Sequence, residues 1–259
     1  MNLETDGVLT SRSQHVTEIR LHRPDRRNAI THAMYDALEL ALEAAGADPA
    51  TRVVLLAGDA ECFTAGNDMQ DFLDNPPANA DSPVVRFLMR LAANVKPLVA
   101  AVNGPAIGIG TTVLLHCDLV CLGHSARLQM PFVNLGLCPE AGSSLLLPRL
   151  AGYQRAAELL LLGEPFDAAR AHEIGLANAV LDDAECLDHA RSIARRLAAR
   201  PPAAVRATRA LLRQGQEDAL AERIRTEAAT FARRLQSPEA QEALRAFMEK
   251  REPDFSAFE

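Results

Sequence analysis

The sequence predicts a mixed α/β fold in which helices cover a largely buried sheet. Short β-branched apolar runs alternate with helical segments along the first third of the chain. The last quarter shows only helical periodicity and is rich in Arg and Glu. With 259 residues, of which 48% are hydrophobic, the chain is long enough to bury a sizeable core. We therefore expect one α/β unit that continues into a helical extension.

The first elements are predicted to be a strand, a helix and a second strand. Val16–Leu21 and Val53–Ala57 are rich in β-branched and apolar residues, and the second run is entirely apolar, as in a buried strand. Thr31–Ala45 is predicted to form a helix, and Thr31 is in a position to cap its start. One face of this helix is apolar and is expected to pack on the sheet; it consists of Met34, Leu38, Ala41, Leu42 and Ala45.

An uncharged run from Pro97 to Cys117 raises the question of a membrane span, which needs roughly 20 apolar residues. Asn103–Pro105 interrupts this run with a turn sequence. The pattern therefore predicts a buried strand at Leu98–Val102, a turn, and a helix from Thr111, and no membrane segment.

The remaining segments are a polar surface region and a series of helices. A polar turn is predicted at Ala65–Phe72, and the content of Pro, Asn and Asp predicts a mobile surface loop at Asp74–Pro83. Periodicity predicts helices at Arg155–Leu162, Asp167–Ile174, Cys186–Ala199, Ala203–Gln214, Glu217–Leu235 and from Pro238 onward, with a short strand at Val180–Leu181. The Arg-rich faces of the last four helices are expected to face solvent or another subunit.

Charge and cysteine content exclude several classes of function. The formal net charge of -7 argues against a nucleic-acid partner, which normally requires a basic face. The cysteines are odd in number and form no CxxC pair, and no histidine spacing is typical of a metal site. The amino terminus is acidic and differs from a basic, apolar leader. We expect a reduced, cytoplasmic protein without a bound metal.

One carboxylate stands out in the long apolar segment from Val102 to Leu150. Glu140 lies there among glycines and apolar residues, with almost no other charge. Burial in such surroundings raises the pKa of a carboxyl toward neutrality, where the group is suited to take up and return protons. The alternative is an exposed loop acid beside Pro139. Taken alone, the residue leaves both interpretations open.

Two clusters of small residues are candidates for binding a negatively charged oxygen. Ala65–Asn67 and Gly108–Gly110 each follow an expected strand, where main-chain N–H groups can point into a cleft. The alternative is that the glycines only permit tight turns, and the spacing matches no nucleotide-binding motif. Ser143-Ser144 lack the pattern of a nucleophile elbow, so we expect them to cap a helix near Leu145.

Four segments carry a highly specific combination of motifs. They are RPDRRNAI at Arg23–Ile30, FTAGNDMQDF at Phe63–Phe72, KPLVAAVNGPAIGIG at Lys96–Gly110 and GEPFDAARAHEIGLANAV at Gly163–Val180. Together they resemble the crotonase, or enoyl-CoA hydratase/isomerase, superfamily over nearly the whole chain. The resemblance implies a spiral of ββα turns at residues 1–184 and a C-terminal helical trimerisation region at residues 185–259. It also implies a homotrimer or dimer of trimers that acts on acyl-CoA thioesters, without a separate cofactor, in fatty-acid β-oxidation.

In this superfamily two main-chain N–H groups bind the thioester carbonyl and stabilise an enolate. By motif position, the resemblance gives these roles to Asn67 and Ile109. Hydratases of the superfamily hold a water between two glutamates, but Thr112 and Phe132 occupy those positions here. The chain is more similar to Δ3,Δ2-enoyl-CoA isomerases of the peroxisomal type, through AGND, VNGPAIGI and PFVNLGLCPEAGSS. Their single catalytic base corresponds to Glu140.

The resemblance therefore implies that Glu140 moves a proton from C2 to C4 of a 3-enoyl-CoA and so forms trans-2-enoyl-CoA. A 2-enoyl-CoA hydratase that uses Glu140 in a rearranged role is the alternative among enzymes. A non-catalytic acyl-CoA-binding protein is the alternative from another class, because a fold can persist after its chemistry is lost.

The resemblance also gives candidate contacts for the substrate. An acidic protein needs local cations for the CoA phosphates, and Arg26 and Arg27 are the first candidates, with Lys250 as a further one. Substrate contacts are also expected from Ala65, Asp68, Met69 and Phe132, of which Phe132 is expected to line the cavity and keep it dry. The wall of the acyl pocket is expected at Phe72–Val84 together with Phe87, Leu88 and Leu91.

Overall fold

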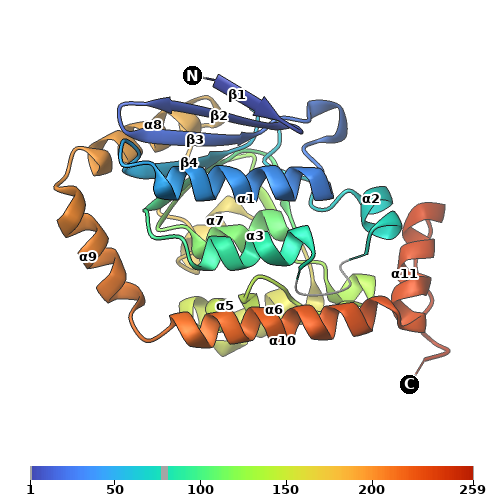
Figure 1. Cartoon of the computed structure of the whole chain (residues 1–259). Coiled ribbons are helices and arrows are strands. Elements are labelled where there is room, and N and C mark those ends of the chain that lie inside the picture. Colours follow the sequence, from blue (N-terminus) through green and yellow to red (C-terminus); the bar gives the residue numbers. More distant parts are fainter. Residues whose placement is uncertain (1, 77–80, 259) are drawn as a thin grey trace.

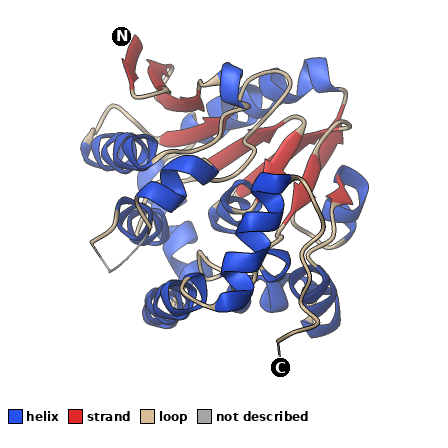
Figure 2. Cartoon of the chain, turned by 90° about the vertical axis from the view of Figure 1, so that its right-hand side faces the viewer, coloured by secondary structure: helices blue, strands red, loops and turns tan. Residues whose placement is uncertain are grey.

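The computed structural model describes residues 2–76 and 81–258. A seven-stranded sheet forms its centre, and helices pack on both faces of this sheet (Figure 1). A separate three-stranded sheet is built from short strands. Helices and strands alternate along much of the chain, and in space the helices lie around the central strands (Figure 2). This architecture confirms the predicted α/β fold class.

The bounds of the elements are as follows. The large sheet contains, in spatial order, β1 (Asn2–Thr5), β2 (Val8–Ser13), β3 (Val16–Leu21), β4 (Val53–Ala57), β5 (Leu98–Val102), β7 (Leu119–Gly123) and β10 (Ala179–Leu181). The small sheet contains β6 (Pro105–Ile107), β8 (Arg127–Gln129) and β9 (Phe166–Asp167). The helices before residue 182 are α1 (His32–Ala47), α2 (Met69–Asp74), α3 (Pro83–Ala92), α4 (Ile109–Thr112), α5 (Ser143–Ala151), α6 (Tyr153–Leu162) and α7 (Ala168–Glu173). The later helices are α8 (Asp183–Ala198), α9 (Pro202–Arg213), α10 (Glu217–Leu235) and α11 (Pro238–Glu249), and the 3-10 turns are η1 (Pro24–Arg26), η2 (Val113–His116) and η3 (Val133–Leu135).

The large sheet changes from antiparallel to parallel at β3. Strands β1, β2 and β3 pair antiparallel with one another, whereas the pairs β3–β4, β4–β5, β5–β7 and β7–β10 are parallel. Parallel neighbours need crossover connections, and α1 supplies the connection between β3 and β4. The carboxyl ends of β3, β4 and β5 therefore meet at one edge of the sheet, where the segments Arg23–Ile30, Gly58–Asn67 and Asn103–Ile109 follow them.

Alternate residues of β4 pack on opposite faces of the sheet. Val53, Leu55 and Ala57 belong to the buried cluster beneath α8. Val54 and Leu56 belong to the main hydrophobic cluster on the other face, with α1 and α3. Because helices cover both faces, every residue of the strand is buried and its sequence is continuously apolar rather than alternating.

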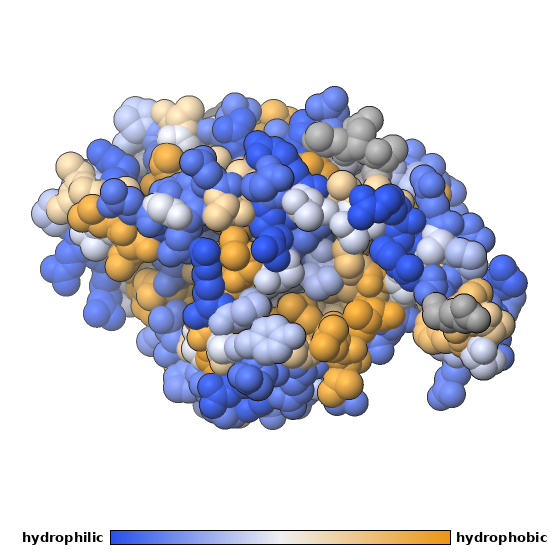
Figure 3. Space-filling model, turned by 90° about the horizontal axis from the view of Figure 1, so that it is seen from below, coloured by the Kyte–Doolittle hydropathy of each residue, from blue (hydrophilic) through white to orange (hydrophobic). Residues whose placement is uncertain are grey.

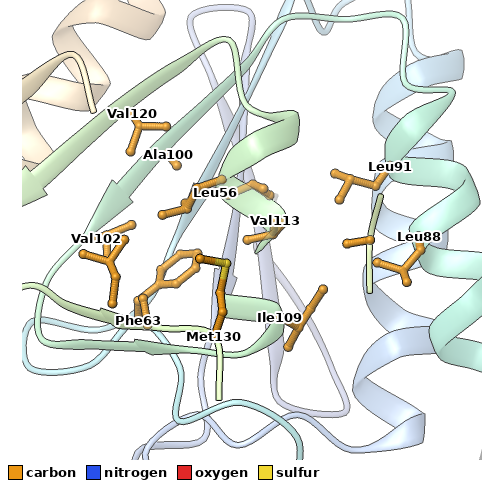
Figure 4. Close-up of a cluster of buried hydrophobic side chains, with 14 of the residues drawn as sticks. Leu56, Phe63, Leu88, Leu91, Ala100, Val102, Ile109, Val113, Val120 and Met130 are labelled. Atoms are coloured by element: carbon orange, nitrogen blue, oxygen red, sulfur yellow. The ribbon is translucent and has the colours of Figure 1, made fainter. Parts of the chain in front are cut away.

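The main hydrophobic cluster extends from the sheet to α3. Figure 4 shows Leu56 and Val102 among the strands and Leu88 on α3, with Ile109 between them. The Ile109 residue is 3% exposed, and it is the first residue of α4. The core therefore fixes the position at which α4 begins.

Many predicted elements are confirmed, with small shifts at their ends. Strands β3, β4 and β5 have the predicted bounds, and the hydroxyl oxygen of Thr31 accepts a hydrogen bond from the Met34 N–H at the start of α1. Helices α6 to α11 and strand β10 lie where periodicity predicted them. Strands β1, β2, β6, β7, β8 and β9 and helix α3 were not predicted.

The predicted turn at Ala65–Phe72 is wrong in its second half. Helix α2 begins at Met69 because the Asp68 carboxylate accepts hydrogen bonds from the N–H groups of Gln70 and Asp71. Of the predicted loop at Asp74–Pro83, residues 77–80 lie outside the described residues, and α3 begins at Pro83.

The predicted serine cap of α5 is also wrong. Gly142 occupies the N-cap position, and Ser143 and Ser144 lie inside the helix. The helix predicted from Thr111 begins earlier, at Ile109, and after Thr112 it continues as the 3-10 turn η2.

After α8, which packs on the sheet, helix α9 runs along the left side of the view in Figure 1, α10 along the bottom and α11 at the right. Helix α10 packs on α3 and α5, far from it in sequence. The expectation that Arg residues of these helices face solvent or a subunit is wrong for Arg209. This residue is 7% exposed, and its guanidinium lies 2.7 Å from the Asp118 carboxylate.

On the face seen from below, hydrophobic side chains lie in separate areas among hydrophilic ones (Figure 3). No helix in the described ranges is long and apolar enough to cross a membrane.

Candidate active site

The site begins where the turn after β4 meets the segment after β5. The Thr64 N–H donates to the Pro105 carbonyl at 3.0 Å, and the Ile107 N–H donates to the Thr64 carbonyl at 3.1 Å. A Cβ on Gly110 would lie 2.5 Å from the Cγ2 atom of Thr64, and one on Gly66 would lie 3.1 Å from the Ile107 carbonyl oxygen. The glycines are therefore required because the two segments approach each other closely.

This close approach leaves two main-chain N–H groups free. Neither the N–H of Asn67 nor that of Ile109 donates a hydrogen bond to a group within residues 2–76 and 81–258. The neighbouring Gly108 N–H, by contrast, donates to the Gln129 carbonyl at 2.8 Å. Ile109 is the first residue of α4, and the first N–H groups of a helix have no acceptor within the helix. Such free N–H groups are suited to bind an oxygen that carries negative charge.

Glu140 lies in the turn that precedes α5. Ala141 and Gly142, the next two residues, have left-handed backbone conformations with φ of 60° and 72°. The Ser143 hydroxyl donates to the Glu140 carbonyl oxygen at 2.6 Å, and the His116 Nε2 atom lies 2.7 Å from the Ala141 carbonyl oxygen. From this turn the Glu140 side chain reaches the Thr112 hydroxyl of α4 and the cavity described next.

The Glu140 carboxylate faces a cavity. Burial in apolar surroundings raises the pKa of Glu140 to about 8, a hydrogen bond donated by the Thr112 hydroxyl lowers it, and the nearby charge of Glu227 raises it. Thr112 is fully buried, so this hydrogen bond is shielded from water. The sequence prediction of a perturbed carboxyl is in line with this environment, in which the neutral and charged forms of Glu140 are both accessible near neutral pH.

The cavity has a volume of about 300 Å³ and is mostly apolar. Its walls come from α2, α3 and α10, and Asn67, Glu140 and Arg225 are the polar or charged members of its lining among the described residues. Phe72, Val84 and Leu88 line it, as the sequence predicted for the acyl pocket, whereas Phe87 and Leu91 are buried in the core behind it.

The sequence did not predict that α10 lines this cavity. Ile224, Ala228 and Phe231 face it, and the Phe231 ring packs edge-on against Phe72 with ring centroids 6.0 Å apart. These three residues are spaced as one face of a helix, which is a signal that the sequence contained.

Tyr35 is a further buried residue that the sequence did not single out. Its hydroxyl donates to the Asn67 side-chain oxygen at 2.5 Å, and its ring packs near Phe87 with centroids 5.6 Å apart. Burial, with a smaller contribution from the charge of Glu140, holds the pKa of Tyr35 well above its usual range. Tyr35 therefore acts as a neutral hydrogen-bond donor that fixes the Asn67 side chain.

The candidate CoA contacts lie beside the same turn. Arg26 and Arg27 are exposed, and the Ala65 N–H donates to the Arg27 carbonyl at 3.0 Å. The Asp68 carboxylate caps α2 and pairs with Arg23 at 2.6 Å, and Met69 is the partly buried first residue of α2. Lys250 is exposed and is the C-cap residue of α11.

Phe132 does not line the cavity among the residues that the structure describes. It is 6% exposed and belongs to the main hydrophobic cluster, at the start of η3. In the same described part of the chain, no group of three or more His, Cys, Asp or Glu side chains is arranged to hold a metal ion.

The family model described as Enoyl-CoA hydratase/isomerase matches residues 11–257. The chain belongs to the enoyl-CoA hydratase/isomerase family. Its structure is similar to that of OdaA from Pseudomonas aeruginosa, with a TM-score of 0.91 and 52% identity over 94% of this chain and 99% of the other. The predicted crotonase fold is therefore confirmed.

Members of the enoyl-CoA hydratase/isomerase family that resemble this chain carry different names. The 2,3-dehydroadipyl-CoA hydratase of Escherichia coli (strain K12) is 35% identical over 249 residues, which cover 96% of this chain and 98% of that protein. Enoyl-CoA delta isomerase 2 of Rattus norvegicus is 32% identical over 254 residues, which cover 96% of this chain and 65% of that protein. Family membership alone therefore does not determine the reaction.

Proposed function

We propose that this protein isomerises 3-enoyl-CoA thioesters to trans-2-enoyl-CoA, with Glu140 as the single catalytic base. One observation carries the proposal: Glu140 is the only carboxylate among the described residues that line the apolar cavity. A shift of one proton along a chain needs one base, whereas the addition of water needs one group to activate water and another to protonate carbon.

In the proposed reaction the ionised Glu140 carboxylate removes a proton from C2. The electrons of the C2–H bond form the dienolate, and the thioester oxygen takes the negative charge. The N–H groups of Asn67 and Ile109 bind this oxygen, and each such donor contributes roughly 3 kcal/mol to the stability of the transition state. Glu140 then returns the proton to C4, so that the double bond lies between C2 and C3. No redox or metal cofactor enters this balance.

Thr112 supports isomerisation over hydration. Its hydroxyl donates to Glu140 and holds the carboxylate in place. A threonine hydroxyl is too weak a base to activate water as a second glutamate would. Hydration of 2-enoyl-CoA remains the second candidate because a hydratase is among the relatives, and the non-catalytic binding protein is the third.

We further propose that the CoA phosphates bind at Arg26 and Arg27 and that the thioester passes the turn of Ala65 and Met69. The exposure of both arginines supports this path, because exposed guanidinium groups can bind phosphates. The main-chain hydrogen bond from Ala65 to the Arg27 carbonyl joins the arginine segment to the turn that carries Asn67. We also propose that residues 1–184 form the core and that residues 185–259 form a trimerisation region. The assembly proposed is a homotrimer or a dimer of trimers.

The experiment that tests the base is the substitution Glu140→Gln. An amide cannot take up the C2 proton, so turnover of a 3-enoyl-CoA should fall at least about 1000-fold, within the range that removal of a catalytic base or nucleophile produces. Affinity for a saturated acyl-CoA, measured by titration calorimetry, should change less than about threefold because cavity and N–H groups remain. Undiminished turnover would refute the assignment.

A further inference from the structure

A buried glutamate of α10 binds the turn that carries Glu140. Glu227 is 6% exposed. Its Oε2 atom accepts a hydrogen bond from the Gly142 N–H at 2.5 Å. Its Oε1 atom accepts from the N–H of Ser144 at 3.0 Å and from the Ser144 hydroxyl at 2.5 Å. Three donors thus converge on one carboxylate. Burial raises the pKa of Glu227, and these hydrogen bonds lower it in part.

The turn that Glu227 holds is conformationally demanding. Ala141 is a non-glycine residue with φ of 60°, a conformation that costs free energy and persists only when neighbouring contacts impose it. A Cβ on Gly142 would lie 2.4 Å from the Leu220 Cδ1 atom, so the turn lies directly against α10. Without the contacts from α10, the backbone next to Glu140 would relax toward ordinary conformations.

Glu227 itself does not line the cavity within the described part of the chain, so it is not a second acid for the reaction. Its neighbours on α10 do line the cavity, among them Ile224 and Ala228. One helix therefore forms a wall of the substrate cavity with one face and binds the turn of Glu140 with the carboxylate of Glu227.

The charged and titratable groups around the two glutamates come from several elements. Glu140 faces Tyr35 of α1, the uncharged Thr112 of α4, and Glu227 and Arg225 of α10. Glu227 faces Arg223 on its own helix and Cys138 of the segment before Glu140, and Arg223 also donates to the Ser144 hydroxyl at 3.0 Å. The charge of Glu227 raises the pKa of Glu140, while burial remains the larger cause.

We propose that Glu227 is a positioning residue for the reaction: by binding Gly142 and Ser144 it fixes the turn that aims Glu140 into the cavity. The proposal rests on the proposed role of Glu140 as the base. It makes the packing of α10 a condition for activity, because the same helix completes the cavity and orients the base.

The test compares Glu227→Ala and Glu227→Gln with the wild type. The control is Asp218→Asn, which removes one negative charge from an exposed position of the same helix. Two reactions are measured on each protein over pH 6 to 9: isomerisation of a 3-enoyl-CoA, and exchange of the C2 hydrogens of butyryl-CoA for deuterium in D2O. Exchange needs the base but no double bond, so it reports on Glu140 even if the enzyme does not isomerise. Thermal melting shows that each variant is folded at the assay temperature.

For Glu227→Ala we expect kcat to fall at least about tenfold with KM changed less than about threefold, because a small displacement of the base slows proton transfer but not binding. Glu227→Gln should recover part of kcat through its remaining acceptor oxygen. In both variants the acid limb of kcat/KM should move to lower pH, because a negative charge near Glu140 is lost. Asp218→Asn should behave as the wild type.

A residue that only stabilises the fold would lower the melting temperature and leave kcat and the pH profile of the folded variant unchanged, and that result would overturn the proposal. If Glu227→Ala does not fold, Ser144→Ala removes one of the three donors and should lower kcat in the same direction; an unchanged kcat would contradict the proposal. A wild type that exchanges but does not isomerise would refute the proposed function alone. A wild type that does neither would refute both.

Discussion

The hydroxyl of Thr112 donates a hydrogen bond to the carboxylate of Glu140 and thereby joins α4 to the turn before α5. The contact favours the ionised form of Glu140 and opposes the effect of burial on its pKa. It also orients the carboxylate beside α4, whose first N–H group, that of Ile109, is free among the described residues. The proposed base and one proposed oxyanion donor are therefore held by the same short helix.

Thr112→Val is expected to lower activity at pH 7 about tenfold. Valine has nearly the same shape but cannot donate to Glu140, and a hydrogen bond to a charged group is worth about 1.5–3 kcal/mol. The acid limb of the pH–rate profile should move to higher pH, since the ionised form loses a donor. Thr112→Ser, which keeps the hydroxyl, is the control and should retain the wild-type profile. Identical profiles for the valine and serine variants would contradict this role.

The activity of the wild type should increase with pH and level off above about 8. Only the ionised carboxylate can accept the C2 proton, and burial raises the pKa of Glu140 to about 8. At pH 6 about one molecule in a hundred would carry the ionised base, so kcat/KM should be about a hundredfold below its plateau. The measurement is kcat/KM for a 3-enoyl-CoA at half-unit intervals of pH. A flat profile between pH 6 and 8 would show that Glu140 titrates elsewhere or is not the base.

Glu140→Gln should make the protein more stable at high pH. The pKa of Glu140 is higher in the folded chain than its ordinary value of 4.5. The contribution of Glu140 to the stability of the fold is therefore fully present below pH 4.5 and is lost as the pH rises through about 8. Glutamine has no charge to bury. The melting temperature of the variant should exceed that of the wild type by about 2 °C or more at pH 9, a change equivalent to about 1 kcal/mol.

The control for this measurement is Glu61→Gln, since Glu61 is exposed. Its melting temperature should follow that of the wild type at every pH. A Glu140→Gln variant whose difference from the wild type is the same at pH 5 and pH 9 would show that burial of the charge does not determine the effect.

Gly110→Ala should reduce turnover about a hundredfold. The added Cβ would lie 2.5 Å from the Cγ2 atom of Thr64, so the segments that carry the N–H groups of Asn67 and Ile109 must separate. Loss of one oxyanion donor costs about 100- to 1000-fold in kcat. Gly46→Ala is the control because nothing lies within 4 Å of its Cβ position. Equal kcat for the two variants would argue against the pair of N–H groups.

The predicted strands β3, β4 and β5 and helix α1 are confirmed because their apolar patterns are long and are set by burial against the sheet. Strands β6, β8 and β9 have at most three residues, which is too short for a period to be read. Their position depends on pairing between distant segments, such as Pro105 with Arg127, and no local pattern encodes such pairing.

The candidate site was predictable where it depends on local sequence. Glu140 is conspicuous because its neighbours are apolar, and Gly66 before Asn67 and Gly110 after Ile109 are needed for a close approach. Glu227 was not predicted because it resembles the other glutamates of an Arg- and Glu-rich helix, and only the packing of α10 on α5 reveals its burial. The serine cap failed for the same reason, since Ser144 binds Glu227 rather than the start of its own helix.

The measurement that tests the central claim most directly is a pair of assays on the purified wild-type protein. One follows conversion of a 3-enoyl-CoA to the 2-enoyl thioester, and the other follows hydration of crotonyl-CoA and of a longer 2-enoyl-CoA. A single base in an apolar cavity predicts isomerisation with hydration at least about 100 times slower, since no second acid or base lines the described cavity. Hydration at a comparable rate would contradict the account, because it would require a second catalytic group beside Glu140.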